Sequence, residues 1–70
     1  EHVRLEIFDL SGRAIRRIAD GVFAPGLHEA RWDLTDDAGR PVPEGVYLER
    51  LLATGIDETR RIVVLRRNRP

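Results

Sequence analysis

Three acidic residues, Asp33, Asp36 and Asp37, form the one acidic cluster of this 70-residue chain. Their carboxylate oxygens are of the kind that binds Ca²⁺. Ca²⁺ takes six to eight oxygen ligands, mainly from carboxylates and carbonyls. The spacing is not that of an EF-hand loop, and no bidentate glutamate closes it. We favour a structural role, in which Asp36 caps the turn to Gly39 and Asp33 pairs with an arginine across strands. The sequence therefore predicts no metal site, and these aspartates are its only Ca²⁺ candidates.

The histidines and the single serine do not suggest a catalytic set. His2 stands at the amino terminus, and His28 shares a predicted strand face with Trp32, so neither has the convergent partners that a metal or acid–base site needs. Ser11 lies in a tight turn, where a serine hydroxyl usually bonds to its own backbone. Phosphate-loop, CxxC and HExxH motifs are missing from the sequence. We expect no catalytic residue, no cofactor and no enzymatic activity.

Composition argues against several classes of partner. Twelve arginines balance twelve acidic residues, and this zero net charge argues against a dedicated nucleic-acid binder or a polybasic membrane binder. No apolar run approaches the ~20 residues of a membrane span. Cysteine is absent, so no disulfide reinforces the chain. The length allows a single domain, residues 1–70, with one thin core.

Short segments between turn signals predict strands. Residues 3–7 and 27–34 alternate between apolar and other side chains, while residues 46–53 and 60–65 are rich in strand-forming residues. Residues 12–21 could form a short helix, but we favour a strand with a bulge near Arg16 and Arg17, because so short a helix would be marginal. The predicted fold is a small all-β sandwich of about five to seven antiparallel strands.

The turns between these strands lie at residues 9–13, 24–26, 36–40, 41–45 and 54–58. Gly12, Gly39 and Gly45 each end a turn before a strand, so we expect positive φ there. The alternating patterns predict a core, with Trp32 as its largest member. That core comprises Val3, Leu5, Ile7, Ile15, Ile18, Ala30, Trp32, Tyr47, Leu51, Val63 and Leu65.

The order of these signals resembles the immunoglobulin-like domain of the flagellar hook-capping protein family. It is also similar to the carboxy-terminal sorting domains of the type IX (Por) secretion system. The resemblance covers about residues 3–66 and rests on an ordered set of individually weak motifs. These are Val3-x-Leu5-x-Ile7-Phe8-Asp9-x-x-Gly12-Arg13, Gly26-x-His28, Trp32-Asp33, Asp36, Gly39, Gly45-Val46-Tyr47 and Arg61-Ile62-Val63-Val64-Leu65.

The resemblance implies a non-catalytic carboxy-terminal module of a larger secreted or cell-surface bacterial protein, which passes the periplasm in transit. Its work would be sorting, anchoring or assembly through a protein partner. The alternative is a carbohydrate- or ligand-binding module, for which Phe8 and Phe23 are the aromatic residues left outside the predicted core. Residues with expected structural roles are Gly12, Trp32, Asp33, Asp36, Gly39, Gly45 and Tyr47.

The resemblance also implies an extended strand before residues 3–7, which this chain lacks. Removing one strand exposes an edge that is a template for another chain. The apolar segment 62–65 is the one we expect to be left uncovered. We expect self-association through exposed strand edges or a strand from a partner, rather than a remnant that is sufficient alone.

Overall fold

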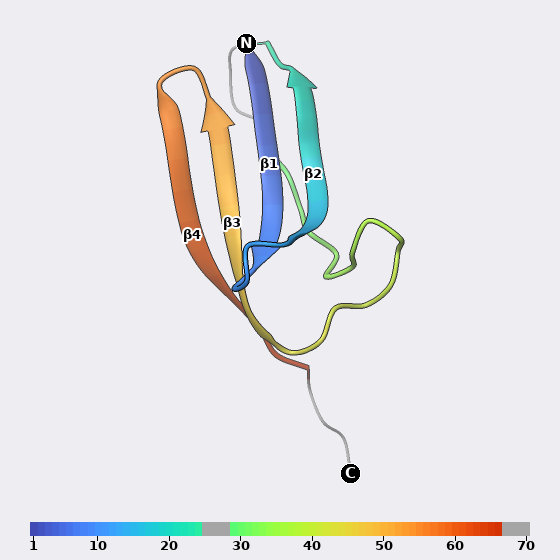
Figure 1. Ribbon diagram of the computed structural model, residues 1–70. Coiled ribbons are helices and arrows are strands. Elements are labelled where there is room, and N and C mark those ends of the chain that lie inside the picture. Colours follow the sequence, from blue (N-terminus) through green and yellow to red (C-terminus); the bar gives the residue numbers. More distant parts are fainter. Residues whose placement is uncertain (25–28, 67–70) are drawn as a thin grey trace.

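The computed structural model describes residues 1–24 and 29–66 (Figure 1). These residues form one antiparallel sheet of four strands in the order β2-β1-β3-β4 and contain no helix. The all-β antiparallel fold class is therefore confirmed. The strands are β1 (His2–Asp9), β2 (Ala14–Val22), β3 (Gly45–Ala53) and β4 (Ile56–Val64).

The hairpin of β1 and β2 contains two irregularities, which confirm the predicted bulged strand. Leu5 pairs with Ala19 but Glu6 pairs with Arg17, so Ile18 is an extra residue on β2. A second shift between Ile7 and Phe8 leaves Ile15 extra in the same way. Bulges change which face a side chain meets. Ile15 and Ile18 therefore both pack against the core although they are three residues apart.

The turn between β1 and β2 is closed by the carboxylate of Asp9. Its Oδ1 accepts hydrogen bonds from the Ser11 backbone N–H (2.9 Å), the Ser11 hydroxyl (2.6 Å) and the Arg13 N–H (3.0 Å). Gly12 has φ 91°, a conformation that side chains with a Cβ rarely adopt. Gly39 (82°) and Gly45 (154°) are also positive, which confirms the prediction for all three glycines.

The core lies between one face of the sheet, here called the inner face, and the segment 29–44 that joins β2 to β3. Figure 1 shows this segment passing the sheet and looping out beside the lower end of β2. Val42 from the segment is buried with Ile7, Tyr47 and Val64 from the strands. Trp32 packs edge-on against Tyr47, with ring centroids 5.6 Å apart. An irregular segment, not a second sheet, is therefore the second layer among the described residues.

The predicted strand at residues 27–34 is wrong for its described part, residues 29–34, while Leu27 and His28 lie outside the described residues. Asp33 Oδ1 accepts hydrogen bonds from the Thr35 N–H (3.2 Å) and hydroxyl (2.5 Å), and this local ring turns the chain. Leu34 has φ 65°, which no strand contains. Ala30, placed in the core by the alternation, is consequently exposed.

The predicted orientation of the last strand is also wrong. Val63 (57% exposed) and Leu65 (77%) point outward, whereas Val64 (2%) is buried. The hairpin loop contains only Thr54 and Gly55, so β4 begins at Ile56 and not after a five-residue turn. A register change of one residue moves every side chain to the other face.

The rest of the predicted core divides into two groups. Val3, Leu5 and Leu51 are half-buried and line an open cavity of about 300 Å³ on the inner face. Ile7 and Tyr47 are buried, and Ile15, Ile18 and Trp32 pack against them, as predicted. The sequence analysis missed Val42, Val64, Leu34 and Ile62, which complete this cluster.

Substitution of two adjacent valines tests the register of β4. Val64→Ala removes buried apolar volume and should lower the free energy of unfolding by about 2 kcal/mol. Val63→Ala is the matched control and should change it by less than about 0.5 kcal/mol, because the side chain is exposed. Urea unfolding of both variants measures the difference. Equal losses, or a larger loss at Val63, would contradict the observed register.

Candidate functional site

The carboxylate of Asp36 organises the turn that the sequence assigned to it. Its Oδ1 accepts hydrogen bonds from the backbone N–H groups of Ala38 and Arg40, both at 2.9 Å. Its Oδ2 accepts another from Arg40 Nε at 3.2 Å, and the Gly39 N–H donates to the Asp36 carbonyl. Each of these bonds is local, as the capping interpretation required.

Asp33 makes a different contact from the one expected. Its carboxylate binds Thr35 rather than an arginine across strands. The indole N–H of Trp32 donates to the Thr35 carbonyl at 2.8 Å, so two neighbouring side chains fix the same turn. The spacing Asp-x-Thr was the sequence signal for this motif, because an Asp side chain readily bonds the backbone two residues ahead.

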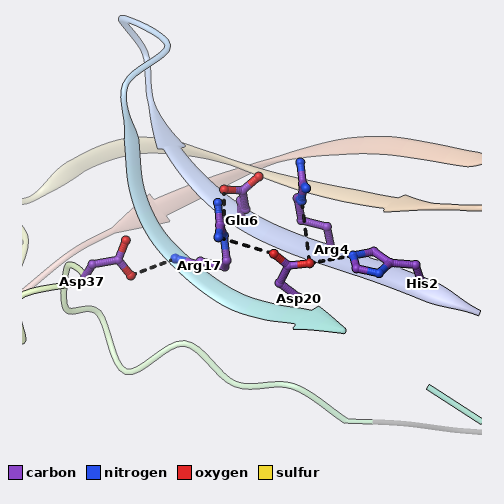
Figure 2. A network of polar contacts seen from close by, with 6 residues as sticks. All are labelled: His2, Arg4, Glu6, Arg17, Asp20 and Asp37. Carbon is purple, nitrogen blue, oxygen red and sulfur yellow. Dashed lines mark hydrogen bonds and ion pairs between the residues drawn. The ribbon is translucent and has the colours of Figure 1, made fainter. Parts of the chain in front are cut away.

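Asp37 joins the segment 29–44 to the outer edge of β2. Its N–H donates to the Ile15 carbonyl at 3.0 Å. Its Oδ1 accepts the Arg17 N–H, also at 3.0 Å (Figure 2). Arg16 Nη1 adds a bond of 2.8 Å to the Asp36 carbonyl. These three hydrogen bonds are here called the loop–edge contact. The two bonds of Asp37 satisfy backbone groups of an edge strand that would otherwise stay unpaired.

The three aspartates are thus divided among separate partners. Asp33 holds Thr35, Asp36 holds its own turn, and Asp37 holds β2. Within residues 1–24 and 29–66, no group of three or more potential ligands is placed to hold a metal ion. The arrangement therefore stabilises loop structure.

A network of charged side chains covers the β1–β2 hairpin on the outer face, the side opposite the core (Figure 2). Asp20 is its centre: Oδ1 lies 2.6 Å from His2 Nε2, and Oδ2 lies 3.3 Å from Arg17 Nη1. Arg17 also lies 3.5 Å from Glu6, and Arg4 lies 4.0 Å from Asp20. The bulge at Ile18 brings Arg17 opposite Glu6, whereas a register without the bulge would place Ile18 there.

Hydrogen bonds lower the pKa of several carboxyl groups. The Arg40 N–H is the main cause at Asp36, and the Thr35 hydroxyl is the main cause at Asp33. The Ser11 hydroxyl lowers the pKa of Asp9, and the contact with His2 lowers that of Asp20. Donors directed at a carboxylate favour its charged form. Turn structure and carboxylate ionisation are therefore coupled.

The aromatic side chains do not form a binding platform. Trp32 and Tyr47 pack against each other, and the Tyr47 hydroxyl donates to the Pro43 carbonyl at 2.7 Å. Phe23 lines the open cavity on the inner face, whereas Phe8 lies on the outer face. The described residues therefore lack the flat array of exposed rings that a carbohydrate-binding module would present.

These features define a small antiparallel β module whose polar side chains support its own turns and edges. Residues 1–55 match the family model of the FlgD Ig-like domain. The chain belongs to this family of flagellar hook-capping immunoglobulin-like domains, which are structural and non-catalytic modules. No curated protein and no solved structure matches it.

Two further findings accompany the family assignment. β4 begins at Ile56, immediately after the matched residues, and pairs with β3 along the whole of that strand. Among the described residues, no helix is long and apolar enough to cross a membrane.

Acid titration of the free energy of unfolding tests the role of Asp36. A lowered folded-state pKa means that the unfolded chain binds more protons in acid, so stability rises with pH. The stabilisation is present above the ordinary carboxyl pKa and should be lost as pH falls below about 4. Asp36→Asn cannot ionise and should flatten this decline. An unchanged slope in the variant would show that the Asp36 charge does not support the turn.

Proposed function

We propose that the chain is a non-catalytic assembly module of a larger extracellular or cell-surface protein, which acts by contacting protein partners. The family match over residues 1–55 carries this proposal, because flagellar hook capping is an assembly function outside the cell. A module that binds a surface-exposed partner in this way would also anchor the larger protein to that partner. The site supports the proposal, since its carboxylates serve turns and edges rather than catalysis.

The outer face offers a surface suited to a protein partner. Phe8 is paired with Leu48, and Val46 is paired with Val63, across neighbouring strands. These four side chains, here called the apolar patch, lie on the same face of the sheet as the charged network, and Phe8 is two residues from Glu6 on β1. An apolar area with a polar rim is the usual composition of a protein contact surface.

A reporter fusion tests the proposal. We expect residues 1–70, fused to a secreted reporter enzyme in the native host, to hold the reporter at the cell surface without changing its kcat or KM. Val46→Asp should release the reporter by placing a charge in the apolar patch. Val22→Asp is the matched control, because Val22 is exposed (81%) and lies outside the patch. A fused reporter that is no more cell-bound than the unfused enzyme would contradict the proposal.

The sorting version needs a separate host. In a bacterium with type IX secretion, a chain that serves as a sorting signal carries the reporter to the surface. A reporter that remains in the periplasm would rule out sorting and leave anchoring and assembly unaffected.

A further inference from the structure

The two edge strands of the sheet, β2 and β4, differ in whether their outward backbone groups have hydrogen-bond partners. The loop–edge contact occupies the Ile15 carbonyl and the Arg17 N–H on the outer edge of β2, but none of the described residues pairs with the outer edge of β4. β4 is exposed at every position from Ile56 to Arg61. An uncovered edge presents a row of N–H and C=O groups to which another strand can add.

The sequence of β4 is complementary to itself around Thr59. If a second copy pairs antiparallel with Thr59 opposite Thr59, then Asp57 lies opposite Arg61 and Glu58 lies opposite Arg60. The two-fold symmetry makes each pair occur twice. Opposite charges placed directly across an antiparallel pair stabilise it, and like charges destabilise it. Four favourable pairs therefore meet in this one register.

Neighbouring two-fold registers lack this complementarity. Centring the pair on Glu58 places two glutamates opposite each other, and centring it on Arg60 does the same with two arginines. Centring it on Asp57 or Arg61 again brings like charges together at the axis. The charges of β4 therefore select the register centred on Thr59.

The backbone N–H and C=O groups of β4 point in the directions that this register requires. Ala53 pairs with Ile56 across the two-residue loop, and in such a hairpin this closing pair exchanges hydrogen bonds. Because the direction of the backbone groups alternates along a strand, the groups of Ile56 and Glu58 point to β3 while those of Asp57 and Thr59 point outward. Thr59 can thus form a hydrogen-bonded pair with its own copy.

The charged side chains are available for such pairing. Glu58 and Arg61 lie opposite leucines of β3 and make no ion pair with any described residue. Arg60 Nε lies 3.9 Å from Glu49, and its side chain is 79% exposed. Asp57 binds Arg50 through two bonds of 2.9 and 2.8 Å, and the far side of its exposed carboxylate can accept a second arginine.

From the open edge, the register and the charges together, we infer that two copies of the chain associate by antiparallel β4–β4 pairing about Thr59. The two four-stranded sheets then form one continuous sheet. The inference does not depend on the proposed assembly function, because it concerns the edge of β4 and not the apolar patch. The sequence analysis predicted self-association through exposed strand edges without naming one. The β4–β4 pairing specifies the strand and the register.

A charge-swap experiment tests the pairing by sedimentation of the 70-residue chain from micromolar to millimolar concentration. The natural sequence should form a dimer that salt weakens. Glu58→Arg alone and Arg60→Glu alone should each weaken association by about tenfold or more, because each places like charges opposite each other twice. An equimolar mixture of these two variants should associate, since each charge then meets its opposite. The double variant E58R/R60E should dimerise as the natural sequence does.

Matched controls separate pairing from folding. Arg13→Glu changes the charge by the same amount as Arg60→Glu but lies in the β1–β2 turn, so dimerisation should be unaffected. The melting temperature of each variant shows that it folds. A natural chain that stays monomeric to millimolar concentration would overturn the inference. A dimer that survives in both single variants, or is lost in the folded double variant, would also overturn it, because the contact would then lie elsewhere.

Discussion

The two hydrogen bonds between Asp37 and the outer edge of β2 are the interaction on which the rest of the structure depends. They hold the segment that brings Val42, Trp32 and Leu34 onto the inner face of the sheet. A single four-stranded sheet cannot bury a face by itself, and only four residues of this chain are buried apolar side chains among those described. The small core therefore persists only while the segment stays docked.

The same contact gives the module two different edges. The segment bonds to β2 at Ile15 and Arg17, while no residue in 1–24 and 29–66 pairs with the outer edge of β4. The carboxylates of Asp33, Asp36 and Asp37, for which the sequence predicted a structural role, hold turns and bind the edge of β2. What remains for partners is the apolar patch and the self-complementary edge. Membership of the FlgD Ig-like family agrees with a role that depends on surfaces rather than on reactive groups.

Much of the fold was predictable because local signals were unambiguous. Strict alternation marked β1, the glycines marked turns, and the paired arginines lay beside the bulges of β2. The predicted strand is wrong over residues 29–34 because alternation does not reveal whether a partner strand exists, whereas the Asp33–Thr35 hydrogen bonds set the backbone locally. The orientation of Val63 and Val64 depended on the length of the 54–55 loop. The docking of Asp37 joins residues twenty positions apart and could not be predicted from local pattern.

Amide hydrogen exchange of the monomer tests the central role of the loop–edge contact most directly. At high dilution, the N–H groups of Arg17 and Asp37 should be protected about as well as those of the central strand β1, because both donate across the contact. The outward N–H of Thr59 is the internal reference and should exchange rapidly. Asp37→Ala should remove the protection of Arg17. Arg17 and Asp37 amides that exchange as rapidly as Thr59 in the natural chain would contradict the account.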